Sequence, residues 1–162
     1  MADIVDTATR SKMMSGIKGK NTSPELFVRK ALHARGFRFR IHVKDLPGKP
    51  DLVLPKYNAV VFIHGCFWHG HDCRYFKLPK TRPEFWVNKI EKNKLRDSEN
   101  IRTLLLSGWR VIVIWECAIR KARKAEFQPP AIERIAMCVQ GGDAFTVVDE
   151  LDIDAASHCQ LC

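Results

Sequence analysis

The sequence predicts an α/β fold in which a small β-sheet of a few strands is flanked by helices. Two runs rich in Val and Ile, at 59–63 and 109–115, are typical of buried strands. A helical pattern over 83–106 lies between them, and other helical patterns precede and follow them. Because strand and helix signals alternate, a layered α/β architecture is expected, with active residues at strand ends and in the loops that follow.

The N-terminal region predicts a basic arm followed by a helix. Residues 1–20 carry Lys and Arg but few aliphatic side chains, so we expect an arm, helical in part, that stands outside the core. In Thr22-Ser23-Pro24-Glu25, a hydroxyl cap precedes a proline suited to a first helical turn and an acid near the helix N-terminus. The helix that begins there is expected to end at Gly36.

The segment 37–64 predicts three strands. Residues 37–43 alternate between apolar and basic side chains, as in a half-exposed strand with a cationic outer face. The stretch 46–50 breaks the chain, a short apolar run follows from Asp51 to Leu54, and 55–58 has the composition of a turn. Since the run 59–63 ends at His64, the last two strands are expected to form a hairpin-like pair.

The remaining chain predicts a long helix, a strand and two shorter helices. The long helix begins at Pro83 and ends near Leu106, before Gly108. After the strand at 109–115, helices are expected over 118–124 and 132–139, and the acidic segment beyond Gly141 is interpreted as a flexible tail. The chain then divides into an arm (1–20), a main domain (21–140) and a C-terminal tail (141–162).

The net charge indicates a nucleic-acid partner. Lys and Arg number 27 against 18 Asp and Glu, a formal charge of +9 that is concentrated in the first forty residues and in 77–102. Such clustering favours a phosphate-binding surface, so the arm is expected to contact DNA. No stretch sets a wide apolar face against its basic residues, which argues against a membrane partner. The absence of a signal peptide leads us to expect a cytoplasmic protein whose thiols bind metal.

The segment 64–73 concentrates imidazoles, thiols and large aromatic rings. Four residues in and beyond it predict a closed, structural Cys3His zinc site: Cys66, His71, Cys73 and Cys117. The alternative is ordinary buried cysteines with incidental histidines, because the spacing is looser than in most zinc sites. At the C-terminus, His158, Cys159 and Cys162 form a competing set, expected to be disordered rather than coordinating, and Cys138 is expected in the core.

A second group of residues suits phosphodiester chemistry. Asp51 opens a strand whose neighbour ends in His64, so a carboxylate can lie beside an imidazole and a strand-end carbonyl. Such a set can hold Mg²⁺ when substrate phosphates supply further ligands. Histidine side chains in general are suited to moving a proton near neutral pH, so His64 and His69 are candidates for that task, and the sequence leaves their roles open. Turn and helix capping are the alternatives for Asp51 and Glu25.

Aromatic side chains near this segment predict a wedge. Phe67 and Trp68 belong to a loop of polar groups and Trp86 lies at the start of the next helix, so they can unstack bases, with core packing as the alternative, above all for Trp86. Met14 on the arm could insert from the opposite groove.

Five sequence blocks occur in order between residues 5 and 120. They are Ala8-Thr9-Arg10-Ser11-Lys12, Leu46-Pro47-Gly48-Lys49-Pro50-Asp51, His64-Gly65-Cys66-Phe67-Trp68-His69, Thr81-Arg82-Pro83-Glu84-Phe85-Trp86, and the stretch from Gly108-Trp109-Arg110-Val111 to Trp115-Glu116-Cys117. With these blocks the chain resembles the very-short-patch repair (Vsr) DNA mismatch endonucleases, and the third block is highly specific.

The resemblance implies a restriction-endonuclease-like core with a small mixed β-sheet, and makes 21–140 the nuclease domain. It implies nicking of one strand on the 5′ side of the thymine in a T:G mismatch, which arises when 5-methylcytosine deaminates. Asp51 then corresponds to the magnesium-binding carboxylate, His69 to the general base, and His64 and Glu25 to supporting catalytic groups. The main-chain carbonyl of Ile63, where the family pattern has Thr, corresponds to a second magnesium ligand.

The same resemblance assigns two further groups of residues. The structural zinc ligands are Cys66, His71, Cys73 and Cys117, and the DNA-intercalating residues are Phe67, Trp68, Trp86 and Met14. A monomer acting on mismatched double-stranded DNA, with other mismatch-repair proteins as partners, is expected. Two other functions stay open: a restriction-like endonuclease that cuts both strands, and a non-catalytic zinc-stapled DNA-binding module.

Overall fold

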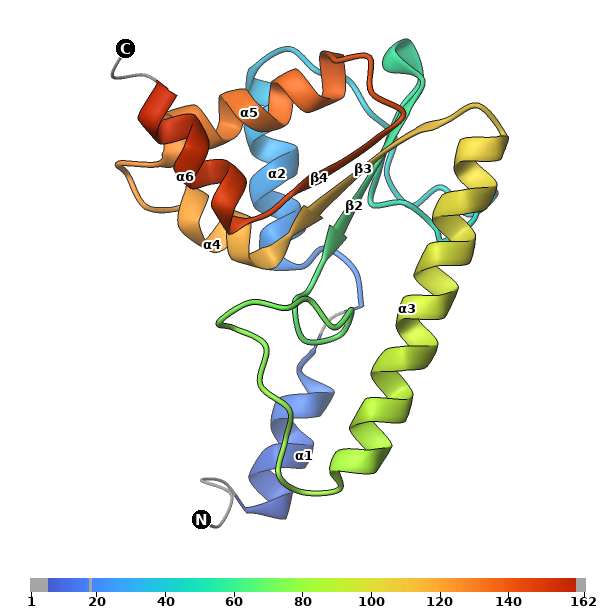
Figure 1. The fold of residues 1–162 in the computed structure, drawn as a ribbon, viewed down its shortest axis with the longest axis vertical. Coiled ribbons are helices and arrows are strands. Elements are labelled where there is room, and N and C mark those ends of the chain that lie inside the picture. The colour runs from blue at the N-terminus through green and yellow to red at the C-terminus, as the bar shows by residue number, and fades with distance from the viewer. Residues whose placement is uncertain (1–5, 18, 160–162) are drawn as a thin grey trace.

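The computed structural model describes residues 6–17 and 19–159, and the side chains of all of these except 10 and 156–159. A four-stranded mixed sheet has the order β1-β2-β3-β4, with β1 antiparallel to β2 and the other pairs parallel. Figure 1 shows α3 on one face of this sheet and α2, α4, α5 and α6 on the other. The predicted α/β architecture with a small mixed sheet is therefore confirmed.

Three of the four strands match the apolar runs predicted from the sequence, and the fourth, β4, was not predicted. They are β1 (Leu52–Leu54), β2 (Ala59–His64), β3 (Arg110–Trp115) and β4 (Phe145–Val148). A 3-10 turn at Pro55–Tyr57 joins β1 to β2, and Asn58 follows it with a left-handed φ of 49°. In the parallel pair β2–β3, Ile63 lies opposite Ile114 and His64 opposite Trp115. Both strands therefore end at one edge of the sheet.

Helices α2 to α5 begin and end near their predicted limits, α1 lies in the arm that was expected to be helical in part, and α6 was not predicted. They are α1 (Thr7–Ser15), α2 (Ser23–Ala34), α3 (Pro83–Leu106), α4 (Glu116–Ala122), α5 (Gln128–Gln140) and α6 (Glu150–Cys159). Thr22 caps α2 as predicted, because its side chain accepts a hydrogen bond from the backbone N–H of Glu25. The predicted bounds of α3 are confirmed at both ends, and Gly108 with φ of 84° turns the chain back toward β3.

The sheet buries both of its faces. On one side, Leu52, Val61 and Ile112 pack against α2, α4, α5 and α6. On the other, Val60 and Val113 pack against Leu104 of α3. Because β2 and β3 are covered on both sides, nearly all of their residues are apolar rather than alternating, which is why continuous Val/Ile runs identified them.

The predicted strand at 37–43 is wrong. Only an isolated bridge between Arg40 and Val53 forms there. His42 has a left-handed φ of 57°, which ends the extended run. Phe37 is buried against Tyr57 whereas Ile41 is 41% exposed, so the alternating side chains do not share one buried face. The alternation of apolar and basic residues that is typical of a strand was present in the sequence, but this segment pairs with β1 through a single bridge only.

The acidic segment beyond Gly141 was expected to be a flexible tail, but β4 and the whole of α6 lie within it. Val148 and Ile153 are completely buried. Asp149 accepts hydrogen bonds from the backbone N–H groups of Leu151 and Asp152, so the acids that suggested a tail cap a helix. Of the competing ligand set, Cys162 lies outside the described residues, and the side chains at 158 and 159 are among those left out.

In the part of the chain that the structure describes, no helix combines the length and the apolar character needed to cross a membrane.

The packing of α6 predicts that Ile153→Ala lowers the free energy of unfolding by about 2–4 kcal/mol, because it empties a fully buried site. Leu151 lies on the same helix and is 74% exposed, so Leu151→Ala should change that free energy by less than about 0.5 kcal/mol. Urea unfolding of both variants measures the difference. A similarly small loss in both would contradict the docking of α6 on the core.

Candidate active site and metal centre

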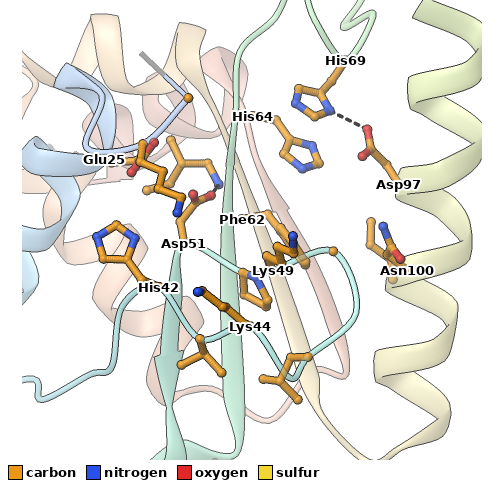
Figure 2. A pocket seen from close by; sticks show the side chains of 18 of the residues that line it. Glu25, His42, Lys44, Lys49, Asp51, Phe62, His64, His69, Asp97 and Asn100 are labelled. Atoms are coloured by element: carbon orange, nitrogen blue, oxygen red, sulfur yellow. Dashed lines mark hydrogen bonds and ion pairs between the residues drawn. The ribbon is translucent and has the colours of Figure 1, made fainter.

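A cleft of about 640 Å³ lies between α2, the end of β2 and α3, and the loop 42–51 forms its rim. Figure 2 shows Asp51, His64 and His69 directed into it from the sheet side, with Asp97 and Asn100 facing them from α3. Cations and carboxylates share the lining: Lys20, Glu25, Arg29, His42, Lys44, Lys49, Asp51, Arg96 and Asp97. The cleft can therefore hold a phosphate beside acid and base groups.

Asp51 is held at the bottom of this cleft by the neighbouring strand. Its Oδ2 accepts a hydrogen bond of 2.7 Å from the backbone N–H of Ile63, and its own N–H donates to the carbonyl of Val61 at 2.9 Å. Burial raises the pKa of Asp51 to about 6, and the negative charge of Glu25 adds to the increase. A cation in the cleft would reverse this penalty.

Two imidazoles are stacked beside Asp51. The rings of His64 and His69 are nearly parallel, with an interplanar angle of 3° and centroids 3.8 Å apart. Burial lowers the pKa of His64 to about 3, and the neighbouring His69 adds to the decrease. His64 is therefore neutral at physiological pH and is available as a hydrogen-bonding group rather than as a cation.

Asp97 completes the histidine pair, and sequence reasoning missed it. Its Oδ2 bonds Nδ1 of His69, across from the loop to α3. The signal in the sequence was faint: Asp97 lies at helical spacing from the inward-facing Ile90, Asn93 and Leu104. A carboxylate on the buried face of a long helix needs a partner, and here the partner is an imidazole.

The loop that carries His69 is pressed against α3. Asn93 donates a hydrogen bond of 2.8 Å to the carbonyl of Trp68. Gly70 has φ of 62°, and a Cβ there would lie 2.6 Å from a methyl of Ile90. Glycine at this position therefore allows the close approach that brings His69 to Asp97.

Glu25 lies beside Asp51, but its carboxylate is already engaged. Oε1 accepts from the hydroxyl of Thr22 at 2.9 Å, and Oε2 accepts from the backbone N–H of Asn21 at 2.9 Å. Arg29 also bonds Oε2, at 2.9 Å, and both side chains are buried. Glu25 is thus part of a capping box as well as of the cleft lining.

The residues around Asp51 fit a divalent cation that prefers oxygen. Oδ2 is engaged by Ile63, and no described residue donates a hydrogen bond to Oδ1. Ile63 lines the cleft beside it. One carboxylate with an oxygen that no described residue engages, in a cleft that can admit phosphate oxygens, suits magnesium, which is usually bound through one or two carboxylates and substrate phosphates.

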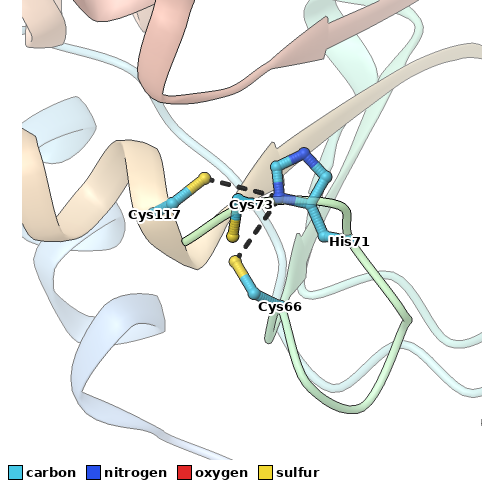
Figure 3. A group of neighbouring side chains, drawn as sticks. All are labelled: Cys66, His71, Cys73 and Cys117. Atoms are coloured by element: carbon cyan, nitrogen blue, oxygen red, sulfur yellow. Dashed lines mark hydrogen bonds between the residues drawn. The ribbon is translucent and has the colours of Figure 1, made fainter. Parts of the chain in front are cut away.

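The four predicted zinc ligands converge at the adjacent edge of the sheet. Figure 3 shows them around one point: Cys66, His71, Cys73 and Cys117. Nδ1 of His71 lies 3.6 Å from the sulfur of Cys66 and 3.5 Å from that of Cys117. In a tetrahedral site with Zn–S of about 2.3 Å and Zn–N of about 2.0 Å, such ligand atoms lie about 3.5 Å apart. The set therefore fits a zinc ion.

The sheet register explains why ligands 51 residues apart meet. His64 lies opposite Trp115 in the parallel pair, and Cys66 and Cys117 each follow two residues later. The ring of His71 stacks on that of Trp115 with centroids 4.2 Å apart, which fixes the third ligand. A hydrogen bond between the two thiols raises the pKa of Cys66 and lowers that of Cys117 to about 6. One thiolate is thus favoured even before a cation binds.

The predicted wedge residues form one aromatic cluster. The ring of Phe67 lies 5.2 Å from that of Trp68 and 5.3 Å from that of Trp86, and the two Trp rings are 6.0 Å apart. Phe76 and Phe85, which the sequence analysis did not single out, extend the cluster. Phe85 is 50% exposed, so the cluster reaches the surface.

Met14 lies on α1. Its side chain is 41% exposed. Figure 1 shows α1 at the end of the molecule where α3 begins, away from α4, α5 and α6.

Comparison with known proteins assigns the chain to a family. The profile described as DNA mismatch endonuclease Vsr matches residues 2–75. The DNA mismatch endonuclease Vsr of Escherichia coli (strain K12) is 44% identical over 149 residues, which cover 92% of this chain and 95% of that protein. The chain belongs to the Vsr family of DNA mismatch endonucleases.

Two type II nicking enzymes are also similar to this chain, over a shorter stretch. The type II nicking enzyme V.XorIIP of Xanthomonas oryzae pv. oryzae is 49% identical over 119 residues, 74% of this chain and 88% of that enzyme. The type II nicking enzyme V.NmeAIP of Neisseria meningitidis serogroup A is 50% identical over 120 residues, 74% of this chain and 86% of that enzyme. As a Vsr-family protein the chain is a nuclease, and the hypothesis of a non-catalytic module is abandoned.

Among the residues predicted for the Vsr site, Asp51, Glu25, His64 and His69 share one cleft. The sequence analysis also gave the zinc ligands and the three wedge rings, which the fold brings together in two further groups. Their chemical roles stay predictions.

The raised pKa of Asp51 predicts a pH-dependent stability difference in metal-free buffer. The folded-state pKa of about 6 exceeds the usual 3.8. Ionisation of Asp51 therefore lowers the free energy of unfolding as pH rises from the lower of these values to the higher. Asp51→Asn should therefore be more stable than the wild type at pH 7, by on the order of 2 kcal/mol, and nearly equal at pH 4. Urea unfolding across this range measures the difference.

The free energy of unfolding of Asp51→Asn must be compared with that of the wild type at each pH, because His64 gives both proteins a pH dependence of the opposite sign. Its pKa is lowered to about 3, so its contribution to stability is lost as pH falls. Asp45→Asn, at an exposed position, is the control. A constant offset between Asp51→Asn and wild type at all pH values would contradict the buried carboxyl.

Proposed function

We propose that this protein is a Mg²⁺-dependent, strand-specific endonuclease with a restriction-endonuclease-like core. Its reaction is a nick on the 5′ side of the thymine in a T:G mismatch, the product of 5-methylcytosine deamination. The observation that carries the proposal is the shared cleft: the Asp51 carboxylate faces the stacked His64 and His69, and His69 is paired with Asp97.

Names of the relatives support the reaction class. The Escherichia coli protein is called a DNA mismatch endonuclease and the Xanthomonas protein a nicking enzyme. A formal charge of +9 is suited to a polyanionic substrate, and the cations Lys44, Lys49 and Arg96 line the cleft itself. A restriction-like cut of both strands is the outcome against which the nick is tested.

The oxygen-rich end of the cleft supports a magnesium site at Asp51 and the main-chain carbonyl of Ile63. When bound there, the ion would polarise a phosphoryl oxygen and lower the pKa of a coordinated water. Asp51 also orients the end of β2 through its hydrogen bond from the Ile63 N–H. The same carboxylate would therefore bind the ion and position the strand end beside it.

Proton transfer is assigned to His69 as the general base. Its Nδ1 is bonded to Asp97, which leaves Nε2 to take a proton from an attacking water. Asp97 holds the ring in that tautomer and stabilises the imidazolium that results. His64, neutral and stacked below, supports the orientation of His69 and can hydrogen-bond the phosphate. Glu25 contributes negative charge beside Asp51 while capping α2.

Mismatch recognition is assigned to the aromatic cluster of Phe67, Trp68 and Trp86, with Met14 entering from the arm. Inserting such side chains unstacks a base step at a cost of a few kcal/mol, which is least where the pair is already mismatched. Because the wedge loop and His69 belong to the same short segment, recognition and cleavage are physically coupled.

We extend the proposal to the cellular setting: a monomer, since one cleft makes one nick, acting in the bacterial cytoplasm with other mismatch-repair proteins as partners.

The test is a duplex with one T:G pair, each strand end-labelled separately and incubated with and without Mg²⁺. We expect one cut, in the thymine strand on its 5′ side, only with Mg²⁺, and at a rate per enzyme that does not depend on enzyme concentration. Asp51→Ala should abolish the cut while mismatch binding is largely kept. Cuts in both strands, or loss of binding together with cleavage, would contradict the proposal.

We also propose that the Cys3His cluster holds a structural Zn²⁺, which staples the loop 66–73 to α4. The loop has little aliphatic content of its own, so its shape depends on such a staple.

The amount of bound zinc should then depend on the cysteines of the cluster and not on cysteines outside it. Purified protein should contain one zinc per chain, and Cys117→Ser should lose most of it. Cys138→Ser is the matched control, because Cys138 is also buried and helical but lies in α5, outside the cluster. Elemental analysis after gel filtration measures both. Full zinc content in Cys117→Ser would refute the ligand set.

A further inference from the structure

We propose that Arg29 sets how tightly the cleft holds a divalent cation in the absence of DNA. It acts through Glu25, whose negative charge it opposes beside Asp51, so that the cation is held firmly only once DNA phosphates enter the cleft. Arg29 is in this sense a positioning residue. The inference rests on the proposed Mg²⁺ site and adds to it the control of its affinity.

Arg29 and Glu25 form a buried ion pair in the wall of the cleft. Nη2 of Arg29 donates to Oε2 of Glu25 at 2.9 Å, one turn earlier in α2. The two residues are 9% and 6% exposed, and both line the cleft together with Asp51. Figure 2 shows the side chain of Glu25 beside that of Asp51. Because the charge of Arg29 is one hydrogen bond away, an ion that interacts with the charge of Glu25 also interacts with that of Arg29.

Further hydrogen bonds hold this ion pair in place. The Glu25 carboxylate accepts from the hydroxyl of Thr22 and from the backbone N–H of Asn21, each at 2.9 Å. Nη1 of Arg29 donates to the side-chain oxygen of Asn21 at 2.6 Å. With both of its oxygens engaged, Glu25 acts on an ion at Asp51 through its charge rather than as a ligand. Arg29 opposes that charge from a fixed position.

Stability alone does not explain an arginine at this position. Nε of Arg29 is buried and has no hydrogen-bond partner among the described residues. A buried donor without a partner costs free energy, and a group of this kind calls for an explanation. A requirement for positive charge in the cleft supplies one.

The pairing of charges in the cleft leaves one acid uncompensated. Of the three carboxylates that line it, Glu25 is paired with Arg29 and Asp97 with His69, whereas no described residue forms an ion pair with Asp51. Magnesium is usually bound through one or two carboxylates together with substrate phosphates. With a single uncompensated carboxylate, the remaining negative charge has to come from DNA. Metal binding and substrate binding then strengthen each other.

The test measures binding of Mn²⁺, which suits the same oxygen ligands as Mg²⁺ and whose free form is counted by electron paramagnetic resonance. The full-length protein is titrated at pH 8, alone and with a T:G duplex that is already nicked on the 5′ side of the thymine. The wild type should bind Mn²⁺ weakly alone and more tightly with this duplex. Arg29→Met removes the charge and keeps most of the stem, and should bind Mn²⁺ without DNA about fivefold or more tightly than the wild type.

Two further variants separate the charge of Arg29 from its packing and from the overall charge. Arg29→Lys keeps the positive charge and should bind Mn²⁺ as the wild type does. Arg35→Met removes a charge just beyond the end of α2, where the ion pair with Glu133 lies outside the cleft lining, and should also leave the affinity unchanged. Since Arg35→Met and Arg29→Met alter the net charge equally, a difference between them reflects the position of the charge.

A second comparison keeps the test decisive if Arg29→Met folds poorly. Glu25→Gln should weaken Mn²⁺ binding, because the charge of Arg29 is then unopposed. Combining Glu25→Gln with Arg29→Met removes both charges and leaves no unpaired buried charge, so the affinity should return close to that of the wild type. An affinity as low in the double variant as in Glu25→Gln would overturn the role of Arg29.

The outcomes distinguish this inference from the proposed function. Mn²⁺ binding that Asp51→Ala leaves unchanged, or that is absent even with DNA, would overturn the metal site and this inference together. Binding that depends on Asp51, with Arg29→Met no tighter than the wild type in the free protein, would overturn the role of Arg29 alone. Binding by Arg29→Lys as tight as by Arg29→Met would also overturn it, because the effect would then come from packing.

Discussion

The parallel pairing of β2 with β3 is the constraint on which the rest of the structure depends. Its register sets His64 opposite Trp115, so both strands end at one edge, and every ligand of the Cys3His cluster follows from that edge. A slip of one residue would turn each side chain to the other face of the sheet. The cleft and the cysteine cluster both lie where these two strands end, so both depend on the same ladder of hydrogen bonds between β2 and β3.

Helix α3 forms the wall of the cleft that faces the sheet. It does so with polar side chains whose burial would cost free energy if they lacked hydrogen-bond partners. Asn93 and Asp97 lie on its inward face between Ile90 and Leu104, and each is matched by a group from the histidine loop. The loop therefore meets the helix through satisfied polar contacts. The same contacts that hold the loop in place also orient His69, so stability and function share them.

Charge in the cleft is balanced only in part. Glu25 is neutralised by Arg29, but Asp51 is half-buried with only one of its oxygens hydrogen-bonded by a described residue, and the loss of hydration raises its pKa to about 6. A site of this kind favours a cation beside a polyanionic substrate, because the ion removes the penalty that the fold imposes. His64, kept neutral by burial, adds no competing positive charge there.

The sequence by itself determined the buried strands at 59–63 and 109–115, the helix at 83–106, the cysteine and histidine set, and the cleft residues Glu25, Asp51, His64 and His69, because these depend on local periodicity and residue chemistry. Tertiary structure alone decided three points. Residues 37–43 form no strand because they find one bridge rather than a ladder. The acidic C-terminal segment folds because Val148 and Ile153 find a core. Asp97 pairs with His69 because α3 crosses the sheet where the histidine loop emerges. Each of these three outcomes depends on a contact with a residue distant in the chain. The pattern of residues within either segment does not reveal such a contact.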